Sequence, residues 1–304
     1  MPELIVLTDL DGTLLDPASY SFQAAEDALK TLDAREIPVV LVSSKTRAEV
    51  EPIRFALNNN HPFIVENGGA LFVPKGLFAF PLEEAVIRGP YQVVETQTTY
   101  VTLRKALKEI EQGLGASLRG FGDMPPEEVA VRTGLSRKDA FLAKQREYDE
   151  PFVIERTEGR AETPGRAQGR GRGQEQRQGP GLEEEAPDEV VAEVERRVEA
   201  RGLRLNRGGR FFHLTGNIDK GQASQRLIDC YRRHWLGRPG GIVTVGLGDG
   251  PNDHPMLALV DRPVAVQRPD GSYHPSLRLP NLVKARGVGP TGWNRAVLEL
   301  LSTL

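Results

Sequence analysis

Near its start the chain contains the stretch Leu4-Ile5-Val6-Leu7-Thr8-Asp9-Leu10-Asp11-Gly12-Thr13, in which an apolar run is followed by two aspartates and a glycine. The apolar run predicts a strand buried on both faces, as in a parallel sheet. Ligands of open α/β sheets bind beyond the carboxyl ends of the strands, so we expect Asp9 and Asp11 to face a binding crevice. Because neighbouring carboxylates repel each other, a natural division of roles is one ionised nucleophile and one acid or base.

Strands and helices of similar length alternate after this stretch. Apolar residues recur at helical spacing in some segments, and short apolar runs stand between them. This alternation predicts right-handed crossovers and therefore an α/β fold with a doubly wound parallel sheet. The expected core elements are helices over 22–35, 46–58, 220–235 and from about 252, and strands over 4–7, 38–42, 63–65, 242–245 and 263–266.

The middle of the chain has a different pattern, because helices there mix with separate strand-like pieces. We therefore expect an α/β core of residues 1–81 and 215–304, with a small α+β cap domain inserted at 82–214. The expected cap elements are helices over 99–114, 137–147 and 188–201 and a strand over 92–95.

Residues 155–187 are rich in Arg, Gly, Glu and Gln and hold almost no large apolar residue. Such a segment cannot bury enough surface to order itself, so we predict a disordered loop within the cap. Its Arg-Gly-Arg-Gly element leaves binding of single-stranded RNA open as a non-enzymatic alternative. Acidic residues balance the arginines and no aromatic residue interleaves them, so this is the weaker interpretation.

The 304 residues carry a net charge of -3 and a pI near 6.1, which argues against nucleic acid or an anionic membrane as a partner. A single cysteine, Cys230, excludes an internal disulfide framework and a cysteine-cluster metal site. No apolar run approaches the roughly 18 residues that span a bilayer. The opening segment also lacks the basic region of a signal peptide. We therefore expect a cytoplasmic protein, of an oligomeric state that the sequence does not indicate.

A second acidic loop, Gly246-Leu247-Gly248-Asp249-Gly250-Pro251-Asn252-Asp253, follows another apolar strand. Its two aspartates would face Asp9 and Asp11 across parallel strands. Together these carboxylates offer hard oxygen ligands of the kind that Mg²⁺ prefers.

Three more polar side chains stand where they could bind a phosphoryl group. Lys220 opens a predicted helix and could supply a cation beside the carboxylates. Ser43 and Ser44 end the second strand and offer hydroxyls. One of these serines is also expected to cap the helix over 46–58.

Asp9, Asp11, Ser43, Lys220 and the Gly-Asp…Asn-Asp loop resemble, in this order, the motifs of the haloacid dehalogenase superfamily of phosphotransferases. The resemblance implies that superfamily's fold, with an α+β cap between the second and third motifs. It also implies a phosphatase that passes through an aspartyl phosphate.

The same resemblance assigns roles to individual side chains. Asp9 would be the nucleophile and Asp11 the acid and base, while Ser43 and Lys220 would hold the phosphoryl oxygens. Mg²⁺ would bind Asp9, Asp11 through its main-chain carbonyl, and Asp249. Asp253 would support Lys220 or a metal-bound water.

Longer segments resemble the mannosyl-3-phosphoglycerate phosphatase family within that superfamily. This implies hydrolysis of mannosyl-3-phosphoglycerate, a small phosphorylated glycoside, to mannosylglycerate and phosphate. A glucosyl-3-phosphoglycerate phosphatase, another sugar phosphatase and a sugar phosphomutase remain alternatives. The segments are VSSKTRAEV from Val42, PFIVENGGALF from Pro62, TGLSRKDAFLAKQREYDEPF from Thr133, GGRFFHLTGNIDKGQA from Gly208 and GLGDGPNDHPML from Gly246.

Substrate recognition is expected between the core and the cap. The element Glu66-Asn67-Gly68 is similar to an asparagine–glycine element of the capped subgroup. A substrate that carries a carboxylate as well as a phosphate calls for bidentate cations, for which arginine is best suited. The cap candidates are Lys144, Arg146, Arg207 and Arg210, with His213 a weaker one.

Overall fold

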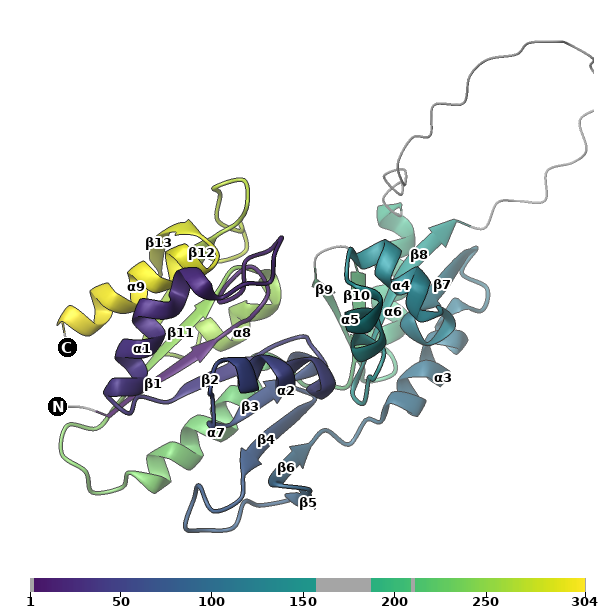
Figure 1. Ribbon diagram of the computed structural model, residues 1–304. Helices are drawn as coiled ribbons and strands as arrows, with labels where there is room; N and C mark the ends of the chain where they lie inside the picture. The colour runs from purple at the N-terminus through teal and green to yellow at the C-terminus, as the bar shows by residue number, and fades with distance from the viewer. Residues whose placement is uncertain (1–2, 157–186, 209–210, 304) are drawn as a thin grey trace, which may run out of the picture.

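The structure, a computed structural model, describes residues 3–156, 187–208 and 211–303. Figure 1 shows two lobes. One is a core that holds both ends of the chain, and the other is a cap that lies on the side of the core away from those ends. Among the described residues, none of the helices combines the length and the apolar composition needed to cross a bilayer.

The described part of the core contains a nine-stranded sheet in the order β13-β12-β11-β1-β2-β3-β4-β6-β5. Strands from β13 to β3 run parallel to their neighbours, and β4, β6 and β5 extend the sheet antiparallel. The strands are β1 (Glu3–Thr8), β2 (Val39–Val42), β3 (Phe63–Val65), β4 (Ala70–Pro74), β5 (Val86–Arg88), β6 (Tyr91–Glu95), β11 (Ile242–Gly248), β12 (Arg262–Gln267) and β13 (Val283–Val288).

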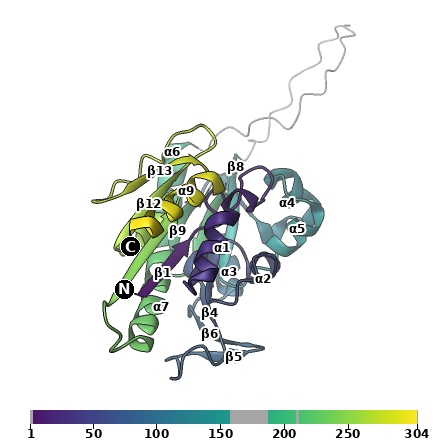
Figure 2. The ribbon, with the colours of Figure 1, turned by 60° about the vertical axis from the view of Figure 1, so that its left-hand side comes forward.

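Helices cover both faces of this sheet, so the predicted doubly wound α/β fold is confirmed (Figures 1 and 2). Leu32 and Trp293 pack with Val6 on one face, while Leu227 packs with Ile5 on the other. Successive residues of β1 point to opposite faces, and helices cover both faces. Its apolar run is therefore buried throughout. The first face carries α1 (Glu26–Ala34), α2 (Arg47–Ala56) and α9 (Pro290–Thr303), and the second carries α7 (Lys220–His234) and α8 (His254–Leu257).

Strands β5 and β6 lie within residues 82–214, which the sequence assigns to the cap, yet they pair with β4 in the core sheet. A strand pattern in a sequence indicates a strand without naming its partner. The division of the chain into core and cap stays a prediction, and the pairing indicates that the change from one sheet to the other follows Glu95.

The cap contains an antiparallel sheet in the order β7-β8-β10-β9, with helices on both faces. The predicted helix over 137–147 is shorter than expected, and a preceding helix, α4, was not predicted. The predicted loop over 155–187 falls mostly on residues 157–186, which lie outside the described residues. The cap elements are β7 (Ala116–Gly120), β8 (Asp149–Arg156), β9 (Arg204–Gly208) and β10 (Phe211–Thr215), with α3 (Tyr100–Glu111) and α6 (Asp188–Glu199) on one face and α4 (Pro126–Thr133) and α5 (Arg137–Ala143) on the other.

Candidate active site

Three carboxylates meet at the carboxyl edge of the core sheet. Strands β1 and β11 are parallel neighbours in which Thr8 pairs with Leu247, so the residues that follow each strand leave the sheet side by side. Asp9, Asp249 and Asp253 each have an oxygen within 4.8 Å of the others. The sheet therefore brings together side chains that are about 240 residues apart in the chain.

Lys220 is the cation of this cluster. It is the first residue of α7, whose N-cap Asp219 accepts a hydrogen bond from the N–H of Gln222 at 2.8 Å. The Lys220 side chain is fully buried, and its Nζ lies 2.5 Å from Asp9 Oδ1 and 2.6 Å from Asp253 Oδ1. Burial alone would lower the pKa of this amine, but the two carboxylates raise it above its usual value, so the lysine is charged.

One lysine does not offset the negative charge of the cluster. Burial, followed by the charge of Asp253, raises the pKa of Asp9 well above its usual value. The same two causes raise the pKa of Asp249 to about 7. Oxygen donors that are crowded together and short of positive charge are the chemistry of a divalent-cation site, so these residues fit a metal ion.

Asp253 has a second structural task in its own loop. While Oδ1 accepts from Lys220, Oδ2 accepts the N–H groups of Asp249 and Gly250, both at 3.0 Å. Asp253 therefore fixes the loop and the lysine together. Asp249 accepts from the hydroxyl of Thr13 at 3.2 Å, which ties this loop to the first motif.

Gly12 makes room for this approach of the two loops. Its φ is +76°, and a Cβ there would lie 2.9 Å from Asp249 Oδ2. Any other residue would be strained and would push the carboxylate away.

Asp11 is not among these three clustered carboxylates, and its side chain pairs with Lys45. Lys45 Nζ lies 2.9 Å from Asp11 Oδ1, and only 10% of the lysine side chain is exposed. Lys45 was not among the residues expected from the sequence, although it lies in the segment VSSKTRAEV that begins at Val42. The signal that could have found it is a lysine directly after the two serines at a strand's carboxyl end.

The two serines occupy the turn between β2 and α2. Ser43 is buried, and its Oγ accepts the N–H of Lys45 at 3.1 Å. Thr46, and not Ser43 or Ser44, caps α2, in a capping box with Glu49. The prediction that a serine caps this helix is therefore wrong, because the turn is longer than the sequence indicated.

The element Glu66-Asn67-Gly68 forms a buried junction between core and cap. The carboxylate of Glu66 accepts the N–H groups of Glu147, at 3.1 Å, and Tyr148, at 2.8 Å. Gly68 has a φ of +104°, and a Cβ there would collide with the main-chain carbonyl of Asp219, beside Lys220. The junction therefore links the cap to the start of α7.

A chain of hydrogen bonds runs through Asn67 from the second acidic loop into the cap. Asn252 Nδ2 donates to Asn67 Oδ1 at 3.2 Å, and Asn67 Nδ2 donates to Asp149 Oδ2 at 3.0 Å. The same Asp149 oxygen lies 2.8 Å from His213 Nδ1. His213 is thereby oriented on the face of the cap sheet opposite to α3 and α6, which pack against its neighbours Phe212 and Leu214.

The remaining cap candidates differ in position. Arg146 is buried and donates through Nη1 to the carbonyl of Ser44, at 2.7 Å. Lys144 donates to the carbonyls of Phe121 and Met124 within the cap. Arg207 is exposed, and its guanidinium lies 5.5 Å from the centre of the Phe212 ring, on the α3 and α6 face. Among these three described cap cations, the structure therefore brings only Arg146 to the turn that holds Ser43 and Ser44. Arg210 lies outside the described residues.

Known proteins resemble this chain over its whole length. A sequence model of the haloacid dehalogenase-like hydrolases matches residues 6–98. A glucosyl-3-phosphoglycerate/mannosyl-3-phosphoglycerate phosphatase of Methanococcoides burtonii is 40% identical over 98% of this chain and 97% of its own. The chain belongs to the haloacid dehalogenase-like hydrolases. Within them, this hydrolase is a member of the same phosphatase family as that relative.

Two further comparisons agree with this assignment. A mannosyl-3-phosphoglycerate phosphatase of Pyrococcus furiosus is 33% identical to this hydrolase over 84% of the chain and 88% of its own. The crystal structure of a Thermoplasma acidophilum protein, 17% identical, superposes over all of both chains with a TM-score of 0.63. The haloacid dehalogenase-like fold is therefore shared well beyond recognisable sequence similarity.

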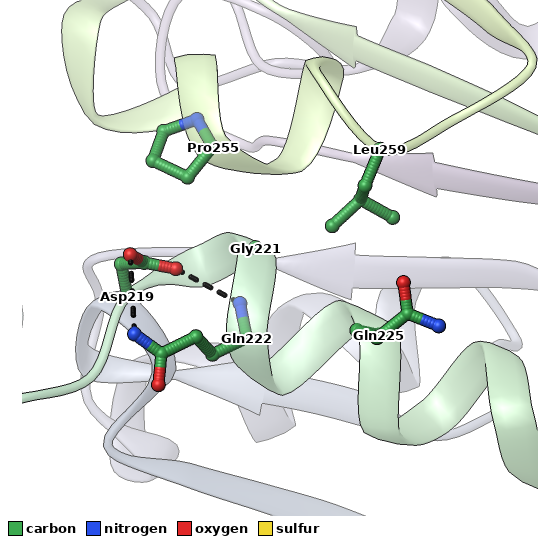
Figure 3. A pocket seen from close by; sticks show the side chains of 6 residues that line it. All are labelled: Asp219, Gly221, Gln222, Gln225, Pro255 and Leu259. Carbon is green, nitrogen blue, oxygen red and sulfur yellow. Dashed lines mark hydrogen bonds between the residues drawn. The ribbon is translucent and has the colours of Figure 1, made fainter.

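A pocket of about 410 Å³ lies beside the start of α7 in this hydrolase, between α7 and α8 (Figure 3). Figure 3 shows the Asp219 carboxylate turned toward Gln222, as its capping role requires. Asp9, Asp249 and Asp253 do not line this pocket. Its lining residues are Asp219, Gly221, Gln222, Gln225, Pro255 and Leu259.

Proposed function

We propose that this hydrolase is a Mg²⁺-dependent phosphatase that removes the phosphate of mannosyl-3-phosphoglycerate through an aspartyl-phosphate intermediate. We propose further that it accepts the glucosyl analogue, since the relative from Methanococcoides burtonii is named for both substrates. The single observation that supports the chemistry best is Asp9. It is a buried carboxylate at a strand end, held by Lys220 and flanked by acidic oxygens.

In the first step, Asp9 attacks phosphorus while Asp11 gives its proton to the leaving alkoxide oxygen. A bond forms between an Asp9 oxygen and phosphorus, and the bond from phosphorus to the glycerate oxygen breaks. Lys220 holds one Asp9 oxygen at 2.5 Å, which leaves the other oxygen for the attack. Ser43 and Lys220 bind phosphoryl oxygens as charge spreads over them.

In the second step, Asp11 removes a proton from a water molecule, which attacks the same phosphorus. The bond from Asp9 to phosphorus breaks, phosphate leaves, and both aspartates return to their starting protonation states. Asp11 therefore acts in both steps, first as an acid and then as a base.

The residues that would hold Mg²⁺ are Asp9, Asp249 and the main-chain carbonyl of Asp11, with Asp253 supporting them through its loop. When bound, the ion supplies the positive charge that lets an anionic nucleophile meet an anionic phosphate. The raised pKa values of Asp9 and Asp249 support this proposal, because the carboxylates need more positive charge than Lys220 provides.

Selectivity must come from the cap, since the chemistry at Asp9 is indifferent to the leaving group. We propose Arg146 as the cation nearest to the glycerate carboxylate, because its guanidinium contacts Ser44 beside the phosphate-binding Ser43. Glu66, Asn67 and Gly68 are proposed to act by holding the cap in place. Strand β9 of the cap contacts the turn Pro251–Asp253, so the cap reaches the second acidic loop.

The test is phosphate release over a panel of substrates. It contains mannosyl- and glucosyl-3-phosphoglycerate, mannose 6-phosphate, glucose 6-phosphate, 3-phosphoglycerate and sucrose phosphate, with Asp9→Asn as the blank. We expect a preference of about a hundredfold or more in kcat/KM for the glycosyl-3-phosphoglycerates, which differ from each other by less than about tenfold. A simple hexose phosphate as the best substrate would overturn the proposal, and activation by a bisphosphorylated sugar without phosphate release would indicate a mutase.

A further inference from the structure

Lys45 is a buried charged residue that the mechanism above does not use. Its ammonium group lies 2.9 Å from Asp11 Oδ1 and 3.7 Å from Glu49 Oε1, with the ring of Tyr20 centred 4.9 Å away. Burial alone would lower the pKa of Lys45, but Asp11 and Glu49 raise it, so the side chain stays charged. A buried cation held at this place calls for an explanation.

The turn between β2 and α2 fixes Lys45 from both sides. On one side, its N–H donates to Ser43 Oγ at 3.1 Å. On the other, Thr46 caps α2, and the Thr46 N–H and hydroxyl both donate to Glu49 Oε2, at 2.9 Å and 3.0 Å. Glu49 is therefore held in place next to the ammonium group, and Lys45 has little freedom to turn elsewhere.

The contact with Lys45 divides the two oxygens of Asp11. Oδ1 is buried, and the ion pair with Lys45 at 2.9 Å compensates its burial. The Asp11 side chain as a whole is 38% exposed. This leaves Oδ2 as the carboxyl oxygen that can face a bound substrate.

We propose that Lys45 is a positioning residue for Asp11. By holding Oδ1, it fixes the carboxyl group so that Oδ2 faces the leaving oxygen in the first step and the attacking water in the second. A carboxyl group that rotates freely would spend only part of its time in a productive orientation. This inference rests on the proposed role of Asp11 as the acid and base.

The competing explanation is that Lys45 binds an anionic group of the substrate directly. That role would be independent of Asp11, and its loss would weaken substrate binding and raise KM. A positioning role instead lowers kcat and disappears when Asp11 can no longer transfer protons. The two roles therefore predict different coupling between the residues.

The experiment is a double-mutant cycle of wild type, Asp11→Asn, Lys45→Met and the double variant, assayed with mannosyl-3-phosphoglycerate and Mg²⁺. We expect Lys45→Met to lower kcat by about tenfold or more with KM nearly unchanged, and Asp11→Asn to lower kcat by about a hundredfold or more. In the Asp11→Asn background, Lys45→Met should cost less than about twofold. An equal loss in both backgrounds, or an effect on KM alone, would overturn the inference.

Two further variants separate positioning from a general structural loss. Lys45→Arg keeps the cation and should recover much of the lost kcat, while Lys30→Met removes a lysine that is 71% exposed on α1 and should leave turnover unchanged. Melting of each variant by circular dichroism checks the fold. Wild-type turnover by Asp11→Asn would contradict the proposed mechanism itself. If Asp11→Asn lowers kcat but Lys45→Met causes the same loss of kcat in both backgrounds, only the role of Lys45 is contradicted.

Discussion

Lys220 Nζ lies 2.5 Å from Asp9 Oδ1, although the two residues are 211 positions apart in the chain. The ammonium group is fully buried and also contacts Asp253. Asp9 directly follows β1 and Lys220 begins α7, so this contact can form only when both halves of the core have come together. Asp9, the proposed nucleophile, is therefore held by a buried charge pair that the fold itself assembles.

Lys220→Met should remove both phosphoryl binding and the support of Asp9. We expect kcat/KM to fall by about a hundredfold or more, as for other groups that stabilise a developing anion. Phosphate release measures the loss, and Lys105→Met, a cap lysine with 80% exposure of its side chain, is the matched control. If Lys220→Met folds and its kcat/KM falls by less than about threefold, Lys220 does not take part in the reaction.

Chelation should abolish activity, because Asp9, Asp249 and Asp253 leave an excess of negative charge after Lys220 is counted. EDTA is expected to abolish phosphate release, and added Mg²⁺ is expected to restore it. Ca²⁺ should replace Mg²⁺ poorly, since it accepts more ligands and could take both oxygens of Asp9. Asp249→Asn should raise the Mg²⁺ concentration needed for half-maximal activity. Full activity in EDTA would contradict the metal assignment.

Glu66 gives the fold a specific pH dependence. Burial raises the pKa of Glu66 to about 8, even though Arg146 and the N–H groups of Tyr148 and Glu147 act in the opposite direction. The folded state then binds more protons than the unfolded state between about pH 5 and pH 8, so this group costs stability as the pH rises through that window. As the pH rises, the free energy of unfolding of wild type should fall relative to that of Glu66→Gln by up to about 1.4 kcal/mol per pH unit. Unfolding at pH 5.5, 6.5 and 7.5 measures the difference, and parallel curves for the two proteins would contradict it.

Two cap arginines should differ sharply in their effect on turnover. Arg146→Ala removes the hydrogen bond to the carbonyl of Ser44 and should lower kcat/KM by about tenfold or more. Arg207→Ala removes an exposed guanidinium over Phe212, on the face of the cap sheet toward α3 and α6, and should change kcat/KM by less than about twofold. A larger loss for Arg207→Ala than for Arg146→Ala would show that the substrate reaches the other face of the cap.

The core fold could be predicted because its signals are local. Short apolar runs alternate with helical spacing, and residues such as Ile5 and Val6 must then be buried on opposite faces. The pairing of β4 with β6 could not be predicted, because Gln92 to Glu95 has the pattern of a strand but carries no information on its partner.

The carboxylate cluster could likewise be predicted, because it follows from where the parallel strands end. The cap residues could not, because a long side chain can reach in several directions from the same main-chain position. Lys144 turns inward to main-chain carbonyls and Arg207 lies over an aromatic ring. Lys45 was missed because its place after the two serines does not show that its side chain contacts Asp11.

In the proposed mechanism, Asp9 carries the phosphoryl group during turnover. The most direct measurement is an acid quench of wild-type enzyme during turnover of mannosyl-3-phosphoglycerate labelled in the phosphate, followed by mapping of the labelled peptide. We expect label on the peptide that contains Asp9, none in Asp9→Asn, and a loss of turnover in that variant of at least about a thousandfold. Label on a different residue, or full turnover by Asp9→Asn, would contradict it.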